Sequence, residues 1–242
     1  MRYLFLLISV FYTMLSCHAQ DEARKALDEA REFTREGKYK EALERHIWFH
    51  NHALEKEPSY YGVRLSFALS DWVALGRKYP EALDALKKIR DEKTARLVAG
   101  EDNRPLFHDV ESINSTLGDW EATVELFRKL DAARPAFAAS VVEMAGETLV
   151  EAGEFGLVKK HMGDPDQRFD EAKSGYERGL EHAKTSTVPD AARGAHERIF
   201  SGEVVRIITV LDKTGDKGKA AEIQKKALAV LDSPAIRDAL NP

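Results

Sequence analysis

Residues 59–90 read SYYGVRLSFALSDWVALGRKYPEALDALKKIR, and this stretch decides the fold. Its first half spaces Leu65, Ala68 and Trp72 so that they share one face of a helix. The run stops at Gly76, and a second run rich in Ala, Leu and Lys follows the turn. The stretch therefore predicts two helices that a tight turn joins into a hairpin.

The same turn recurs along the chain, each time between two helical runs. Glycine suits such a turn because it adopts a positive φ after a helix without a Cβ clash. An aromatic residue follows the glycine in four of the five segments and can pack across the turn. The other segments are EGKYKEAL at 36–43, LGDWEATV at 117–124, AGEFGLV at 152–158 and TGDKGKAA at 214–221.

These segments resemble the tetratricopeptide repeat (TPR), a pair of antiparallel helices of ~34 residues. The family's first helix carries W-x2-L-G-x2-Y, and its second helix has small residues and a closing proline. The matching residues are Val142, Ala145, Gly146 and Leu149 in one first helix, and Thr123, Phe127 and Pro135 in one second helix. The resemblance covers most of residues 22–234. It implies an all-α fold, a right-handed superhelix of about five helix pairs over residues 22–241.

The repeat pattern breaks up in its fourth copy, at KKHMGDP, residues 159–165. Aspartate before proline is typical of a helix start, because Asp caps the first turn and Pro fits the first helical position. A new helix is therefore predicted near Asp164. Another is predicted near Asp190, after TSTVP.

The N-terminus, MRYLFLLISVFYTMLSCHAQ, differs from the rest of the chain. A basic residue, a short apolar run and small residues are the form of a secretory signal peptide, and the run is shorter than the ~20 residues of a membrane span. Residues 1–19 are predicted to be removed on export. Alternatively, Cys17 resembles the lipidated cysteine of a bacterial lipoprotein and would give a lipid anchor. Either route predicts a periplasmic or cell-surface protein without a transmembrane span.

Composition narrows the function classes. Hydrophobic residues make up 43% and charged residues 32%, and the net charge of −5 disfavours a nucleic-acid partner. Cys17 is the chain's single cysteine, so the mature chain has no thiol for nucleophilic or metal chemistry. The sequence contains no G-x-S-x-G, P-loop or GxGxxG motif. No cofactor is implied, and no enzymatic activity is predicted.

Three of the eight histidines fall in ERHIWFHNHALEKEP, residues 44–58. His46 and His50 share a helix face, whereas His52 lies about 200° further around the helix. Because a zinc ion takes four ligands, or three and a water, this trio does not predict a metal site. The interpretation favoured by the spacing is a packed helix with partly buried imidazoles.

A ligand cluster of His46, His50, Arg64 and Asp71 is the alternative interpretation of this region. Arg64 and Asp71 are seven residues apart, nearly on one face of a continuous helix. They could join a structural network with a side chain from a neighbouring repeat, or contact a ligand. An enzyme or a small-ligand or metal-binding protein built on this cluster is the second functional hypothesis.

The TPR resemblance implies that first helices line a concave groove. A polar, mildly acidic groove would suit an extended peptide held by hydrogen bonds. The first functional hypothesis is therefore a non-enzymatic exported scaffold or adaptor that binds a protein or peptide partner. The groove residues implied by the repeat register are Arg31, Ser66, Ser70, His108, Ser112, Glu143 and Glu147.

Overall fold

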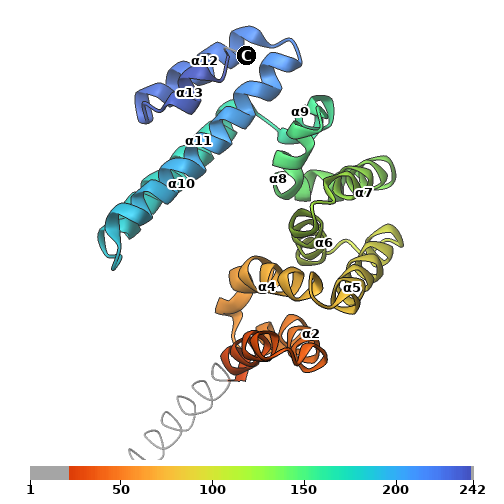
Figure 1. Ribbon diagram of the computed structural model, residues 1–242. Coiled ribbons are helices and arrows are strands. Elements are labelled where there is room, and N and C mark those ends of the chain that lie inside the picture. Colours follow the sequence, from red (N-terminus) through yellow and green to blue (C-terminus); the bar gives the residue numbers. More distant parts are fainter. Residues whose placement is uncertain (1–21, 241–242) are drawn as a thin grey trace, which may run out of the picture. The chain divides into compact units, whose positions relative to one another are not determined.

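The computed structural model describes residues 22–240, and all regular structure in that range is helical (Figure 1). The predicted all-α class is confirmed. The chain divides between Ala122 and Thr123 into two compact units. None of the described helices combines the length and apolar character that a membrane span requires. The predicted signal peptide, with Cys17, lies outside the described residues.

The first unit begins with a helix at residues 22–36. It is followed by a long helix, a short broken segment and three further helices. These are α2 (Tyr39–Lys56), the 3-10 turn η1 (Pro58–Tyr60), α3 (Tyr61–Leu65), α4 (Phe67–Gly76), α5 (Pro80–Val98) and α6 (Arg104–Leu117).

The second unit is also a succession of helices, and its first helix starts just before the division point. These are α7 (Trp120–Ala133), α8 (Pro135–Glu151), α9 (Phe155–Met162), α10 (Pro165–Lys184), α11 (Pro189–Lys213), α12 (Lys217–Val230) and α13 (Pro234–Asp238). The predicted starts near Asp164 and Asp190 are confirmed by α10 and α11. The Asp164 side chain accepts a hydrogen bond from the Gln167 amide at 2.9 Å, as an N-cap does.

Four of the five turn glycines have the expected backbone. Gly37, Gly118, Gly153 and Gly215 have φ values of 77°, 73°, 79° and 88°. Gly76 is the exception, because it is the last residue of α4 and lacks a positive φ. A Cβ added there would lie 2.3 Å from Leu83 Cγ. Gly76 therefore serves close packing between α4 and α5 rather than backbone freedom.

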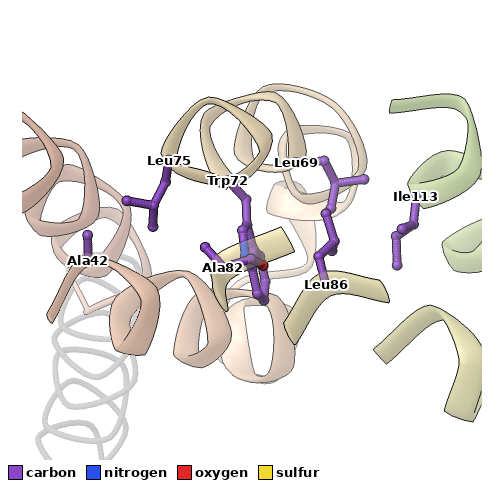
Figure 2. Packing of buried hydrophobic residues seen from close by; sticks show 7 residues of the cluster. All are labelled: Ala42, Leu69, Trp72, Leu75, Ala82, Leu86 and Ile113. Atoms are coloured by element: carbon purple, nitrogen blue, oxygen red, sulfur yellow. The ribbon is translucent and has the colours of Figure 1, made fainter. Parts of the chain in front are cut away.

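Trp72 of α4 lies at the centre of the main core of the first unit. Figure 2 shows it among buried side chains from α2, α4, α5 and α6. Its Nε1 donates a hydrogen bond to the Ala82 carbonyl at 2.8 Å, so the buried indole has its polar group satisfied. The cluster consists of Ala42, Leu69, Trp72, Leu75, Ala82, Leu86 and Ile113.

The helix expected to run through Leu65 to Trp72 is broken. α3 ends at Leu65 and α4 begins at Phe67, while Ser66 has φ −129° and ψ −90°, outside the helical region. The Ser66 hydroxyl donates to the Gly62 carbonyl at 2.7 Å. The prediction that Arg64 and Asp71 share a face of one continuous helix is therefore wrong.

The second unit is built around the α10–α11 hairpin, whose long antiparallel helices lie side by side in Figure 1. Tyr176 stacks on Phe200 with ring centroids 5.1 Å apart and planes at 24°. Phe169 meets the same ring edge-on at 6.4 Å. These three rings join the two helices, and α8, α9 and α12 pack against the hairpin.

Candidate functional site

A buried ionic cluster joins four helices of the first unit around Arg64 and Asp109. The Arg64 guanidinium donates from Nη1 to Asp109 Oδ1 at 2.5 Å and from Nη2 to Oδ2 at 2.7 Å. Its Nε donates to the His50 carbonyl at 2.6 Å. Arg64 is 6% and Asp109 is 7% exposed. This two-pronged contact holds α3 against α6 and against the C-terminal half of α2.

Lys93 of α5 adds a second cation to the same carboxylate. Its Nζ donates to Asp109 Oδ2 and lies 3.0 Å from His50 Nε2. Burial lowers the pKa of Lys93, against the opposing attraction of Asp109. Burial alone would raise the pKa of Asp109, but the bonds and charges of Arg64 and Lys93 lower it to about 2. The cluster therefore holds two cations and one carboxylate, with positive charge in excess.

His50 is held neutral inside this cluster. Burial and the charges of Arg64 and Lys93 lower its pKa to about 3. Because both neighbours of Nε2 are donors, Nε2 must accept and the proton must sit on Nδ1. Nδ1 is buried and has no hydrogen-bond partner among the described residues. His50 thus helps to position the cations but offers no basic nitrogen to a ligand.

His46 is a packing residue one turn earlier on α2. Its ring stacks on Trp72, with centroids 5.6 Å apart and planes at 24°. It is 2% exposed, and neither ring nitrogen has a hydrogen-bond partner among the described residues. Burial lowers its pKa to about 4. Such an imidazole is neutral near pH 7 and contributes packing area rather than chemistry.

The surroundings of these histidines oppose a metal ion. Between residues 22 and 240, no group of three or more His, Cys, Asp or Glu side chains is placed to hold one. His52 lies apart from the other two and faces Glu55 at 3.2 Å. Arg64 and Lys93 would repel a divalent cation from His50.

The structure brings together only part of the predicted ligand cluster. His50 and Arg64 are in contact, and His46 is linked to His50 through Trp72, which both imidazoles touch. Asp71 is elsewhere, because it accepts a hydrogen bond from Arg31 Nε at 2.8 Å at the surface. A site made of all four residues is therefore not formed.

Sequence reasoning missed Asp109 and Lys93, which complete the cluster. A signal for Asp109 was present, because it stands between Leu106 and Ile113 on the face that α6 buries. A carboxylate on a buried helix face requires a cationic or hydrogen-bonding partner. Lys93 gave no such signal, since it belongs to a helix with many exposed lysines and arginines.

The predicted groove residues lie in different environments. Ser70 is exposed on α4, Ser66 is exposed immediately before it, and Arg31 pairs with Asp71. His108 is half-buried, with Nδ1 2.8 Å from the Tyr61 hydroxyl. Ser112 is a correction, because at 8% exposure it is buried in α6 and presents no surface.

The remaining two groove residues belong to α8 in the second unit. Glu143 contacts Arg168 at 3.1 Å and also Arg206, so it is part of an ion bridge between α8, α10 and α11. Glu147, one turn later, is exposed.

An exposed aromatic residue marks the accessible face of α4. Phe67 is 69% exposed, and Ser70 and Ala74 continue the exposed stripe at helical spacing. The opposite face of α4 is fixed in the core through Leu69 and Trp72. Small side chains around a projecting ring leave room for a partner to close over it, and sequence reasoning had singled out only the two serines.

No protein-family model matches the chain, and neither does any curated protein. The likeness to the tetratricopeptide repeat therefore rests on residue pattern alone and stays a prediction.

Proposed function

We propose that the chain is an exported, non-enzymatic scaffold or adaptor that binds a protein or peptide partner. The observation that supports the proposal is the exposed stripe of α4, which begins at Phe67 and continues through Ser70 and Ala74. Aromatic residues are enriched in protein interfaces, where a buried ring contributes a large share of the binding energy.

Rigidity supports this role. α4 is anchored below by Trp72, and the segment before it is held by the Arg64–Asp109 contact. A surface on such a base loses little conformational freedom when a partner binds. The exposed hydroxyls of Ser66 and Ser70 can add hydrogen bonds to a peptide backbone.

The proposal includes the arrangement that the repeat pattern implies. Consecutive hairpins would stack into a right-handed superhelix, and first helices would line its concave side. Export would place this surface in a periplasm or on a cell surface. The second hypothesis is an enzyme or ligand site at His46, His50, Arg64 and Asp71. No observation favours it, because Arg64 is already hydrogen-bonded to His50 and Asp109, and Asp71 instead contacts Arg31.

The test is partner capture with matched variants of the full chain. Phe67→Ala should abolish capture from the native envelope without changing the melting temperature, because an exposed ring adds little to folding. Val188→Ala is the control, since Val188 is also an exposed large apolar residue, at 60%. Ser70→Arg should block the same partner sterically. If both α4 variants capture the same proteins as the unaltered chain, this surface does not bind them.

A further inference from the structure

A cavity of about 370 Å³ opens in the second unit between α8, α9, α10 and α11. Its volume is within the range of small-ligand sites, which enclose ~300–1,000 Å³. Much of its wall is apolar and comes from all four helices. The apolar residues that matter here are Val142, Val158, Met162, Ala172, Tyr176 and Phe200.

The cavity persists because α10 presents small residues toward it. Ala172 and Gly175 are one turn apart on α10, beside the stacked rings of Tyr176 and Phe200. A Cβ added at Gly175 would come no closer than 4.0 Å to any neighbour, and the nearest atom is Arg178 Nη2. The space beside Gly175 is therefore open to a ligand or to a larger side chain.

Two arginines at the cavity are already engaged. Arg168 donates from Nε to the Met162 carbonyl at 2.7 Å and pairs with Glu143 at 3.1 Å and Glu171 at 3.2 Å. Arg206 donates to the other oxygen of Glu143. Their positive charges are thus matched by two carboxylates in direct contact.

Glu203 differs from the other carboxylates of the cavity. It is half-buried on α11, one turn before Arg206, and forms no hydrogen bond or ion pair with any described residue. Burial raises its pKa, and so does the charge of Glu143, while the charges of Arg206 and Arg168 act in the opposite direction. Burying part of a carboxylate that has no hydrogen-bond partner in the protein costs free energy, and a bound cation would offset this cost.

We propose that this cavity binds a primary ammonium group carried on an alkyl chain, with Glu203 receiving the ammonium and the apolar wall holding the methylene groups. The ligand should carry a positive charge because Glu203 is a carboxylate without a partner among the described residues. It should carry an alkyl chain because Met162, Tyr176 and Phe200 form an apolar wall. An anion would meet Glu203 at close range, while Arg168 and Arg206 are occupied. Arg178, also at the lining, is exposed, so water and salt screen it.

Two sources share this chemistry, namely a free diamine or polyamine and the lysine side chain of a peptide. The first experiment titrates the purified chain with 1,5-diaminopentane, spermidine and a lysine peptide with blocked ends, using calorimetry. We expect saturable binding of at least one of them. A norleucine peptide of the same length, which lacks the ammonium, should not bind. Whichever compound binds more tightly, a free amine or the lysine peptide, identifies the kind of ligand that the cavity prefers.

The charge contribution is tested by Glu203→Gln, which keeps the shape of the side chain. Loss of a charge-assisted hydrogen bond should weaken binding about tenfold or more. Glu177→Gln is the matched control, because Glu177 is an exposed glutamate of α10 outside the cavity. Equal weakening by both variants would mean non-specific attraction to a negative surface and would overturn the proposal.

The shape contribution is tested by Gly175→Leu against Gly175→Ala. Both changes favour the helix, but only leucine fills the cavity. Binding should be lost with leucine and kept with alanine, while both variants melt no lower than the unaltered chain. Absence of saturable binding of any amine at millimolar concentration also overturns the proposal. The proposed partner surface on α4 is unaffected by either result, because it belongs to the first unit.

Discussion

At the scale of single residues, Asp109 determines whether the buried cluster is stabilising. It contacts both Arg64 and Lys93, and Asp109→Asn would leave two desolvated cations without a counter-charge. We expect the free energy of unfolding to fall by roughly 3–5 kcal/mol, the usual effect of breaking a buried pair from one side. Urea unfolding followed by tryptophan fluorescence measures this change.

The comparison variant is Lys93→Met. It removes the excess cation and keeps an unbranched side chain of similar length. Because positive charge exceeds negative charge in the cluster, this variant should lose less stability than Asp109→Asn. Equal losses would show that charge balance is not what the cluster provides.

The two buried histidines should make folding sensitive to mild acid. The pKa of each lies near 6.5 in the unfolded chain, and burial lowers it to about 4 for His46 and about 3 for His50. As pH falls below 6.5, these two imidazoles bind protons in the unfolded state but stay neutral in the folded state, so the free energy of unfolding decreases. Each imidazole contributes a slope of about 1.4 kcal/mol per pH unit, ending near pH 4 for His46 and pH 3 for His50.

Urea midpoints at pH 7.5, 6 and 5 measure this slope. The charged groups that act on His46 are Asp71, which raises its pKa, and Arg31, which lowers it, but burial has the larger effect. His46→Phe should reduce the histidine contribution to this slope by about half, because His50 still contributes, and it should keep the stacking on Trp72. His52→Ala is the control from the same helix, because the His52 side chain is 44% exposed and lies outside the buried pair. An unchanged slope in His46→Phe would contradict the assignment.

The sequence predicted the places of these residues only in part. Helical spacing placed His46 and Trp72 on buried faces, and both are buried. It could not pair Arg64 with Asp109, because 45 residues separate them and their contact depends on how α3, α5 and α6 pack. Long-range pairing of charges is set by tertiary packing, which a single sequence encodes only through the demand that a buried charge be matched.

At the scale of elements, Gly76 tests how closely α4 and α5 pack. Gly76→Ala gains up to about 1 kcal/mol of helix propensity but places a Cβ within 2.3 Å of Leu83 Cγ. Overpacking of this kind costs about 1–3 kcal/mol, so the net effect should be a lower melting temperature. Thermal unfolding by circular dichroism measures it.

Gly202→Ala is the matched control. Gly202 is exposed in α11, and a Cβ there would meet nothing within 4 Å, so this change should raise the melting temperature. The double variant Gly76→Ala/Leu83→Ala should behave better than the sum of its single changes, because the clash disappears with the leucine. Strict additivity would point to another cause.

Helix existence was more predictable than helix continuity. Glycine turns, and the prolines near Asp164 and Asp190, marked the ends of most helices, because those residues favour particular backbone geometries regardless of their surroundings. The break at Ser66 had no such marker. A serine in an apolar run is compatible with a helix, so the φ of −129° and ψ of −90° at Ser66 could not be predicted from the sequence.

At the scale of the whole molecule, each of the two units carries a different candidate binding feature. The first presents an exposed aromatic stripe on a rigid helix, and the second encloses a cavity with an unpartnered carboxylate. In our proposals a protein or peptide partner contacts the first, and an alkyl ammonium group enters the second. Partner binding on α4 would depend on shape and on buried apolar area, whereas ammonium binding in the cavity would depend on the charge of Glu203. Added salt should therefore weaken ammonium binding and leave partner binding unchanged.

Export is the remaining proposal at this scale, and the mass of the mature chain tests it. Cleavage after Ala19 would leave Gln20 as the first residue, whereas lipidation would leave a diacyl or triacyl group on Cys17. Intact mass spectrometry of chain recovered from the bacterial envelope distinguishes the two. If Cys17 is lipidated, Cys17→Ser should remove the added mass of the lipid. If the chain is instead cleaved after Ala19, Cys17→Ser should leave secretion unchanged, because that cleavage does not need the thiol. An unprocessed chain that stays inside the cell would contradict export, and with it the envelope location of the proposed partner.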